Sequence, residues 1–457
     1  MKPTTVDELL KKAERPAKLA PAYHKLYAGK LQVMPKCAIR TLRDLDIWYT
    51  PGVAEPCKII KGNPDASFEY TNRWNCVAVV SDGSRVLGLG NIGPEAGLPV
   101  MEGKALLFKY LGGVDAFPLV IRPRDADEFI RLLELIEPSF GGINLEDIER
   151  PKCFYILEEA RKRLKIPVWH DDQQGTATVV LAALINALKI VGKRISEVKI
   201  AMIGAGAANI KTADVLELAG AKPGNIVMVD VKGILSPERR DLLEENDLWA
   251  WKWALKSNAE GKRGGIPEAL EGADVCIAAS RPGPGIIKKE WIAKMASDAI
   301  VFTIANPIPE IWPWEAKEAG ARVVATGRSD FPNQINNSLG FPGIFRGVLD
   351  VKAKTITDEM CVAAAKAIAE FAEERGIHED YVVPTMDEWE VYPREAVACA
   401  LEAMRQGVAR VKLSRDELWE RAVTIIKQAR ESLEALMRAG LIKLPPPEEE
   451  IMTTHEP

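Results

Sequence analysis

Short apolar runs alternate with longer segments of helical spacing over most of the chain. GGINL (141–145) and IPVW (166–169) are short and apolar, and PKCFYILEEARKRL (151–164) between them has apolar residues at helical spacing. The second run leads into QQGTATVVLAALINALKIV (173–191), which predicts a long buried helix. Two strands joined by a crossover helix form a βαβ unit, so we expect parallel neighbours whose carboxyl ends lie about 5 Å apart.

Each of these two strands is followed by two acids, Glu146 and Asp147 after the first and Asp171 and Asp172 after the second. Four carboxyl groups at one sheet edge repel one another, so such a cluster needs a cation or shared protons. Oxygen ligands without Cys or His favour Mg²⁺ or Mn²⁺ over zinc. Helix capping is the alternative for Asp172, but capping explains one of the four acids. The pattern therefore predicts a divalent-metal site.

The alternation also holds on the N-terminal side of this unit. NCVAVVSD (75–82) and AFPLVI (116–121) predict strands on either side of a glycine-rich loop (83–104) and a helix that Lys104 opens. A glycine-rich loop lets backbone approach a ligand closely. A lysine at a helix start tends toward a lowered pKa, which suits a base, although most lysines are solvated surface groups.

The first 56 residues are less regular. Residues 1–35 are Lys-rich, and VDELLKKAERPAKLA (6–20) predicts an amphipathic helix cut by Pro16, an arm on a neighbouring surface of this chain or of a second subunit. Tyr49 stands where a strand-like run stops before the turn YTPGVAEP. By itself, such a tyrosine is more often a packing residue than a catalytic one.

A second pattern begins near Lys193 and predicts a dinucleotide site. A strand (199–204), a helix (205–220) and a strand ending at Asp230 enclose GAGAAN, which resembles the G-x-G-x-x-G fingerprint with Asn209 at the third glycine. The turn and the helix N-terminus offer free amides to a pyrophosphate, and Asp230 can bond the ribose hydroxyls. Asp230 favours NAD by repelling a 2′-phosphate, but Lys232 could neutralise it and admit NADP. The fingerprint set comprises Gly204, Ala205, Gly206, Ala207, Ala208 and Asn209.

Three further strands, at 274–280, 299–305 and 322–326, are each followed by a loop rather than a hairpin. Ligands of a doubly wound sheet bind outside the carboxyl ends of its strands, which nominates Ser280, Asn306 and the Asn336–Asn337 pair for cofactor or substrate. For each asparagine, turn formation is the alternative. A tryptophan-rich insertion (245–265) is expected to pack on its own domain or on another subunit, and 352–438 is predicted to be helical.

Length and composition limit the class of protein. A chain of 457 residues suits two or three domains, and a net charge of −5 gives no support for nucleic-acid binding. Seven scattered cysteines without a CxxC pair indicate reduced thiols in a cytoplasmic protein. We see no signal peptide and no uninterrupted apolar span, so no membrane partner is expected.

These patterns predict an α/β protein with an N-terminal α/β catalytic domain, a Rossmann-type doubly wound dinucleotide-binding domain and a helical C-terminal region. The expected divisions are a helical arm at 1–35, the catalytic and metal domain at 36–192, the nucleotide domain at 193–350, helices at 351–440 and a loose tail at 441–457.

Several segments together resemble one family, the malic enzymes, specifically their shorter bacterial and archaeal members. The matching segments lie in family order over about residues 45 to 350, without room for the acyltransferase-type domain of longer relatives. They are YTPGVAEP, SDGSRVLGLGNIGPEAGLPVMEGKALLFK, GGINLEDIERP, HDDQQGTA, the GAGAA turn, IANPIPE and QINNSLGFPGIFRG.

The resemblance implies a role for each matching residue. Tyr49 resembles the general acid and Lys104 the general base, with Asp171 beside the lysine. Glu146, Asp147 and Asp172 resemble the metal ligands. The remaining implied contacts are Thr176 with the cofactor, Arg85 with a substrate carboxylate, Asn306 with substrate and nicotinamide, and Asn337 with substrate.

The implied reaction is oxidative decarboxylation of (S)-malate to pyruvate and CO₂ with reduction of NAD or NADP, dependent on Mg²⁺ or Mn²⁺. A non-decarboxylating hydroxy-acid or amino-acid dehydrogenase is the first alternative, and a non-catalytic dinucleotide-binding regulatory protein is the second. The resemblance also implies a homodimer or higher homo-oligomer in which Tyr49 can reach a neighbour's site.

Overall fold

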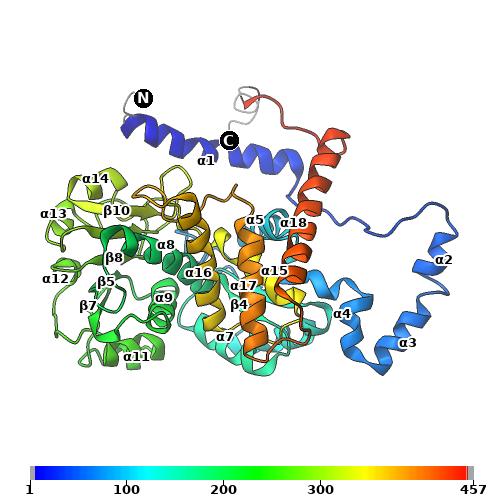
Figure 1. Ribbon diagram of the computed structural model, residues 1–457, viewed down its shortest axis with the longest axis horizontal. Helices are drawn as coiled ribbons and strands as arrows, with labels where there is room; N and C mark the ends of the chain where they lie inside the picture. Colours follow the sequence, from blue (N-terminus) through cyan, green and yellow to red (C-terminus); the bar gives the residue numbers. More distant parts are fainter. Residues whose placement is uncertain (1–5, 449, 451–457) are drawn as a thin grey trace.

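The computed structural model describes residues 6–448 and 450, so residues 449 and 451–457 of the predicted loose tail lie outside the described residues. Two sheets, one parallel and one parallel except for an edge strand, form the body of the molecule, and helices cover each of them (Figure 1). The predicted α/β class with a Rossmann-type domain is confirmed.

The first sheet has four strands, all parallel, and carries the four acids at its carboxyl edge. In spatial order its strands are β2 (Asp115–Val120), β1 (Cys76–Ser81), β3 (Gly142–Leu145) and β4 (Val168–His170). The connecting helices are α5 (Pro94–Gly112), α6 (Ala126–Ile136) and α7 (Lys152–Arg163). β3 and β4 pair in parallel with Leu145 opposite His170, as the βαβ pattern predicts.

The second sheet has six strands and a reversal of strand order at its centre. Its order is β10 (Ala321–Thr326), β9 (Ala299–Thr303), β8 (Val275–Ala278), β5 (Ile200–Ile203), β6 (Ile226–Asp230) and β7 (Gly233–Ile234). All pairs are parallel except β6 with β7. The chain leaves β5 toward β6 and returns on the other side to β8, so the ligand-binding switch point lies at the carboxyl ends of β5 and β8.

The helices of the second sheet are shorter. They are α9 (Ala207–Leu218), α10 (Asp241–Glu244), α11 (Leu248–Lys256), α12 (Ile266–Leu270), α13 (Lys289–Ile292) and α14 (Pro313–Glu318). The tryptophan-rich insertion contains α11 and packs on its own chain, since Trp249 stacks on Phe154 at 5.1 Å and buried Trp253 donates to Asp214 at 3.1 Å.

One helix joins the two sheets. A π-helical turn η4 (Asp171–Gly175) leads into α8 (Thr176–Val191), whose side chains are almost all buried. By length and apolarity Asp171–Val191 could span a membrane, which the sequence analysis did not recognise, but 72% of the 18-residue window that passes this test is buried inside the protein. Its hydropathy therefore reflects a core position between the two sheets.

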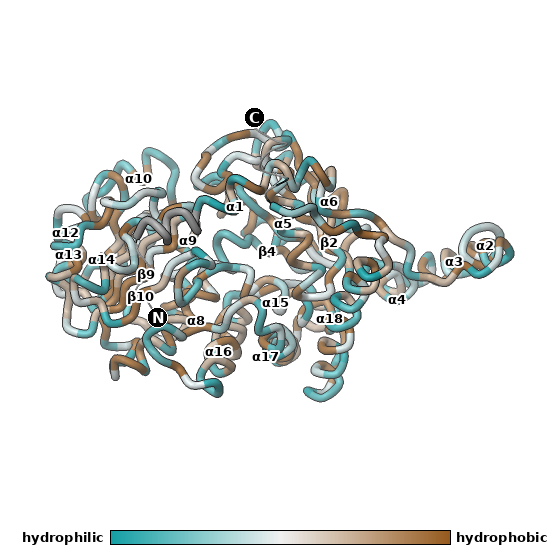
Figure 2. Tube along the Cα trace, turned by 90° about the horizontal axis from the view of Figure 1, so that it is seen from above, coloured by the Kyte–Doolittle hydropathy of each residue, from teal (hydrophilic) through white to brown (hydrophobic). Residues whose placement is uncertain are grey.

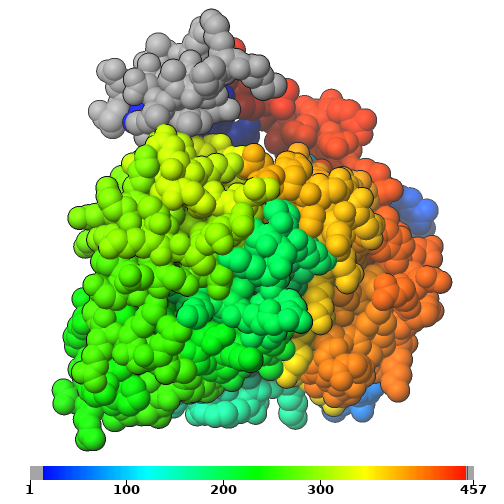
Figure 3. All heavy atoms as spheres, turned by 60° about the vertical axis from the view of Figure 1, so that its left-hand side comes forward, coloured from blue at the N-terminus to red at the C-terminus, as the bar shows by residue number. Residues whose placement is uncertain are grey.

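The predicted helices of 352–438 are present as α16 to α18, and a further helix, α15, precedes them within the predicted nucleotide domain and packs on the first sheet. These helices are α15 (Phe341–Asp350), α16 (Asp358–Arg375), α17 (Val391–Arg405) and α18 (Arg415–Arg438). Phe108 of α5 lies 4.6 Å from Phe341 and 5.1 Å from Phe345, ring centre to ring centre, so α15 shares the core of the first sheet. From the side, segments near residues 200–300 and 350–420 form one continuous surface (Figure 3).

The N-terminal helix α1 (Val6–Tyr27) runs through Pro16, so the predicted cut there is wrong. A proline fits helical φ and removes one N–H, which a long helix tolerates at a cost. α1 lies along the top of the molecule beside the C-terminal segment, where the Tyr27 hydroxyl donates to the carbonyl of Lys443 at 2.7 Å (Figure 1).

A projecting segment (residues 31–62) leaves the body between α1 and the first sheet. It carries α2 (Asp44–Trp48) and α3 (Ala54–Gly62), which stand away from β4 and α5 in two perpendicular views (Figures 1 and 2). No residue of α2 or α3, both within the described part of the chain, is buried. The run before Tyr49 is therefore the short helix α2 and not the predicted strand.

The remaining short turns complete the described chain. They are η1 (Pro64–Ala66), α4 (Ser67–Tyr70), η2 (Asn72–Asn75), η3 (Glu137–Ser139), η5 (Pro223–Asn225) and η6 (Asn337–Leu339).

Candidate active site

Three of the four acids meet at the carboxyl edge of β3 and β4. One ligand oxygen from each of Glu146, Asp147 and Asp172 lies within 4.8 Å of the others. Glu146 and Asp147 are 3% and 4% exposed, and Asp172 is half-buried. Parallel pairing of the two strands places these oxygens together, as the βαβ argument predicts.

Asp172 does not cap the helix that follows it. Its Oδ2 accepts a hydrogen bond from the backbone N–H of Asp147 at 2.9 Å, which joins the two strand ends across the cluster. Asp147 has φ of +55°, a left-handed conformation that turns the chain after β3. The capping alternative is therefore wrong, and Asp172 belongs to the carboxylate group.

Burial and mutual repulsion change how these groups titrate. Burial, with repulsion from Asp172, raises the pKa of Asp147 to about 8, and burial raises the pKa of Glu146 well above its usual value. Burial lowers the pKa of the neighbouring His170 to about 4, so its ring is neutral at pH 7. With a pKa of about 8, Asp147 mostly holds a proton at pH 7 until a cation replaces it.

The residues present fit a hard divalent cation. The donor set is three carboxylates, and the buried Oδ2 of Asp147 has no hydrogen-bond partner within the described residues. An orphaned buried oxygen beside two further acids needs a positive partner. Carboxylate oxygens suit Mg²⁺ and Mn²⁺.

Lys104 lies beside this group and is 8% exposed. Its Nζ donates to Asp171 Oδ2 at 2.5 Å, lies 3.2 Å from Glu146 Oε1 and 3.4 Å from Asn337 Oδ1. The ring of Phe341 lies 4.4 Å from the ammonium. The fourth acid therefore pairs with the lysine, apart from the other three, as the resemblance implies.

The pKa of Lys104 was expected to be lowered, and this expectation is wrong when only the protein's own residues surround the lysine. Burial lowers this pKa, but attraction to Asp171 and Glu146 outweighs burial, and the pKa of Lys104 lies above its usual value. The helix-start argument also fails, because α5 begins ten residues earlier at Pro94. The apolar run after Lys104 suggested a helix start there, whereas Pro94 occupies the first helical position of α5.

Asn337 and Gly175 shape the lysine's surroundings. Asn336 accepts from Ser338 N at 3.0 Å and is the turn former of the pair, which leaves Asn337 to face Lys104. A Cβ on Gly175 would lie 2.1 Å from Asp171 Oδ1 and 3.0 Å from Asn337 Cβ. Only glycine allows these two side chains to converge there.

Two residues nominated by the resemblance stand apart from this group. Tyr49 follows α2 in the projecting segment and is 73% exposed. The side chain of Arg85 is exposed, while its backbone N–H donates to the carbonyl of Asp147 at 3.0 Å. The glycine-rich loop is thus tied to the carboxylate group, but the tyrosine of the same chain is not.

The fingerprint turn follows β5 as predicted. Gly204 has φ of +98°, and a Cβ on it would lie 2.5 Å from the carbonyl oxygen of Ala279. α9 begins at Ala207 with Gly206 as its N-cap, and no side chain in the described chain caps it, so its first amides are available to a phosphate. Ala205 is buried, and Ala207, Ala208 and Thr176 are half-buried.

Asn209 accounts for the missing third glycine. It is fully buried, and its side-chain N donates to the carbonyls of Ile203 at 3.0 Å and Gly204 at 2.8 Å. It therefore holds the turn against β5 from within and has no exposed surface for a cofactor.

Glu310 is a residue that the sequence analysis missed. Its buried carboxylate accepts from Ser280 N at 2.8 Å, Ser280 Oγ at 3.0 Å and Ala305 N at 3.3 Å. It thereby joins the loops after β8 and β9 and positions Ser280 and Asn306. Its place in the IANPIPE segment was the only available signal.

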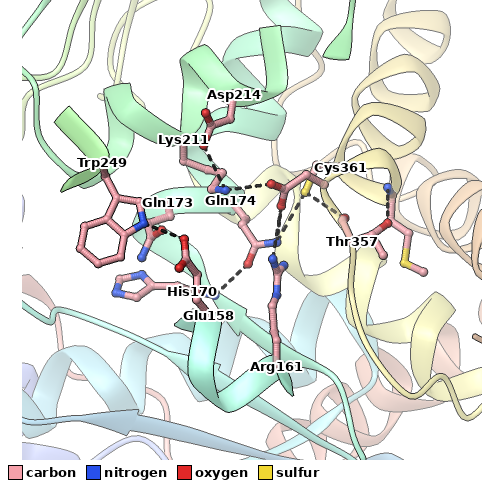
Figure 4. Close-up of polar contacts among 12 residues, drawn as sticks. Glu158, Arg161, His170, Gln173, Gln174, Lys211, Asp214, Trp249, Thr357 and Cys361 are labelled. Atoms are coloured by element: carbon pink, nitrogen blue, oxygen red, sulfur yellow. Dashed lines mark hydrogen bonds and ion pairs between the residues drawn. The ribbon is translucent and has the colours of Figure 1, made fainter. Parts of the chain in front are cut away.

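A buried polar group, also missed, connects the two sheets behind η4 (Figure 4). Lys211 of α9 donates to Asp358 at 2.8 Å, and Arg161 of α7 lies 3.5 Å from the same carboxylate. Gln174 accepts from His170 N at 3.2 Å and donates to Asp358 at 3.4 Å. The turn that carries Asp171 and Asp172 is therefore anchored to helices of both sheets.

The neutralising partner expected for Asp230 is also different. Lys232 bonds Asp230 through its backbone N–H at 2.8 Å, while its ammonium pairs with Asp241 and Glu245. Arg239 forms the ion pair with Asp230 instead, at 2.7 Å.

Comparison with known proteins agrees with this arrangement. The N-terminal domain model of malic enzymes matches residues 28–161, and the NAD-binding domain model of malic enzymes matches residues 173–405. A bifunctional malic/malolactic enzyme of Bacillus subtilis is 48% identical over 407 residues, which cover 88% of this chain and 97% of that protein. An NAD-dependent malic enzyme of Geobacillus stearothermophilus is 49% identical over 84% of this chain and 78% of its own.

Solved structures give the same result. The malic enzyme of Entamoeba histolytica has a TM-score of 0.95 and 47% identity over 99% of this chain and 96% of its own. That of Pyrococcus horikoshii has a TM-score of 0.86 and 55% identity over 90% of this chain and 95% of its own. The resemblance seen in the sequence is confirmed, and the chain belongs to the malic enzyme family.

Proposed function

We propose that this protein catalyses the oxidative decarboxylation of malate to pyruvate and CO₂ with reduction of a nicotinamide dinucleotide. The observation that carries the proposal is Lys104, buried between Asp171 and Glu146 beside three converging carboxylates. A dehydrogenase that does not decarboxylate has less need for a cation at the substrate oxygen. A non-catalytic regulatory protein needs neither the buried lysine nor the converging carboxylates.

The residues around Lys104 suit the first of the two proton transfers, removal of the proton from the C2 hydroxyl of malate. Lys104 accepts the proton of the C2 hydroxyl, with Asp171 at 2.5 Å holding its Nζ in place. Asp171 contributes most to the raised pKa of Lys104, but Glu146 and Asp172 also raise it and are among the residues that would bind a cation, so their engagement lowers that pKa toward the range of a base. Asn337 orients Nζ from the other side at 3.4 Å.

Glu146, Asp147 and Asp172 would hold Mg²⁺ or Mn²⁺, which supplies Lewis-acid stabilisation of the negative oxygen formed as CO₂ departs. The Gly204–Gly206 turn and the first amides of α9 would hold the pyrophosphate of NAD or NADP, which accepts the hydride. Ser280, Asn306 and Thr176 line the nicotinamide side of this proposed site. Arg85, on the loop joined to Asp147, would pair with a carboxylate of malate.

We further propose that Tyr49 protonates the enolate at C3 in the site of a second copy of the chain. The projecting segment exposes an unusual number of apolar side chains for a monomer, including Val33 at 84%, Leu42 at 82% and Ile47 at 65%. A symmetric dimer would cover this surface and bring Tyr49 to the neighbour's Lys104. The exposed apolar surface thus supports the proposal of at least a homodimer.

The test uses purified protein with malate, MnCl₂ and each nicotinamide in turn. Reduced cofactor and pyruvate should appear in equal amounts, and a chelator should abolish both. Asp172→Asn should remove activity, while Glu149→Gln, which removes a neighbouring half-exposed acid, should not. Reduced cofactor without pyruvate would overturn the proposed function.

A further inference from the structure

Asp230 occupies the position from which an acid reads the ribose of a bound dinucleotide. It ends β6, which pairs with β5 with Val229 opposite Ile203, and Gly204 N donates to Val229 O at 2.7 Å. The carboxylate is therefore beside the fingerprint turn. In this fold such an acid bonds the 2′-hydroxyl of NAD, and an arginine nearby can instead accommodate the 2′-phosphate of NADP.

Arg239 is the nearby arginine, and its donors are already engaged. Nε donates to Asp241 Oδ1 at 2.8 Å, and Nη1 donates to Asp230 Oδ1 at 3.0 Å and to the carbonyl of Gly233 at 3.3 Å. Nη2 donates to Asp230 Oδ2 at 2.7 Å and to Asp241 Oδ2 at 2.9 Å. A guanidinium has five N–H groups, so all five are used and none is left for a phosphate.

Asp230 retains capacity for a hydroxyl. Its Oδ1 accepts from Arg239 and from the backbone of Lys232, whereas its Oδ2 accepts from Arg239 alone. A carboxylate offers about four acceptor positions, so one remains at Oδ2. A ribose hydroxyl can therefore donate to Asp230 without displacing Arg239.

The charge around this position is unfavourable for a second phosphate. Lys232 Nζ lies between Asp241 at 3.1 Å and Glu245 at 2.6 Å. Three carboxylates against two cations leave one net negative charge at the place where a 2′-phosphate would add about two more.

We infer that Asp230, Arg239 and Asp241 make this protein select NAD over NADP, with Asp241 holding Arg239 away from a 2′-phosphate. The inference rests on the proposed function, since it assigns that reaction its cofactor. Asp241 acts by occupying Nε and one N–H of Nη2 on Arg239.

The test is a binding titration of the full-length protein with NAD⁺ and with NADP⁺, without malate, by calorimetry. The unmodified protein should bind NAD⁺ at least about tenfold more tightly, because the 2′-hydroxyl of NAD⁺ can donate a charge-assisted hydrogen bond to Asp230 and the 2′-phosphate of NADP⁺ cannot. Asp241→Ala frees two N–H groups and removes a negative charge, so the Kd for NADP⁺ should fall about tenfold while that for NAD⁺ changes less than about threefold.

Two further variants make the result specific. Glu238→Gln removes an exposed charge one residue away that pairs with Arg263 at 3.3 Å and does not touch Arg239, so it should leave the ratio of the two Kd values unchanged. Asp241→Asn keeps the side-chain volume and should change the ratio in the same direction as Asp241→Ala, by less.

Equal affinity of the unmodified protein for both cofactors would overturn the inference, as would an Asp241→Ala ratio no different from that of Glu238→Gln. Selective binding without malate turnover would leave the inference standing and refute the proposed reaction. Failure of both cofactors to bind would refute both.

Discussion

The position of Tyr49 predicts that each active site is completed by two chains. The perturbation is a pair of single variants, Tyr49→Phe and Lys104→Ala. Each homodimer should lose activity by a factor of about 10² to 10⁴, because each lacks one proton-transfer group in both sites. Co-expression with two different affinity tags yields the mixed dimer after two purification steps.

The arrangement of the residues determines the expected activity of that mixed dimer. In the site formed around the intact Lys104, the tyrosine comes from the other chain and is also intact. The second site then lacks both groups. One working site of two predicts about half of the unmodified activity per dimer.

The assay follows reduced nicotinamide with malate and Mn²⁺ at equal dimer concentration. If the tyrosine acted within its own chain, every site of the mixed dimer would lack one group, and activity would stay at the level of the single variants. That result would refute the reasoning. The control is a mixed dimer with both substitutions on one chain, which should show no working site if the tyrosine acts in trans and one if it acts in cis.

Four other substitutions probe the interior of the protein, three in the site and one at Glu395 of α17. Asp172→Asn should weaken Mn²⁺ binding by about tenfold or more in calorimetry, whereas Asp171→Asn should lower kcat with a smaller change in Mn²⁺ affinity; the opposite pattern would exchange their roles. Gly175→Ala should lower kcat/KM by about 10², because its Cβ would lie 2.1 Å from Asp171 Oδ1, and an unchanged rate would contradict the packing argument. Glu395→Gln should stabilise the fold at pH 7, because burial raises the pKa of Glu395 well above its usual value and both of its oxygens lack a partner within the described residues. Between about pH 4.5 and the raised pKa, only the unfolded chain releases this proton, so unmodified stability falls by about 1.4 kcal/mol per pH unit from this group, and denaturant unfolding of Glu395→Gln should lack that slope.

Local pattern was sufficient for most elements and for the carboxylate group. Strands β3 and β4, helix α7 and the fingerprint turn lie where their apolar spacing predicts. The acids converge because they follow neighbouring parallel strands, whose carboxyl ends lie at the same edge of the sheet. Family motifs added the pairing of Asp171 with Lys104, which spacing alone did not indicate.

Long-range packing decided what the pattern missed. Glu310 bonds Ser280, which is 30 residues away, and Arg239 pairs with Asp230 across an irregular segment. Hydrophobic periodicity marks neither partner. The pKa of Lys104 depends on the sum of burial and several nearby charges, so its helix position alone gave the wrong sign.

The sequence by itself determined the strand and helix order, the carboxylate edge and the dinucleotide turn, because each depends on neighbours within one βαβ unit. Only the tertiary structure decided which arginine holds Asp230, how the Asn209 side chain serves in place of the third glycine, and that Tyr49 projects away from its own chain's lysine. The physical reason is that side-chain partnership depends on distance in space, which local periodicity does not encode.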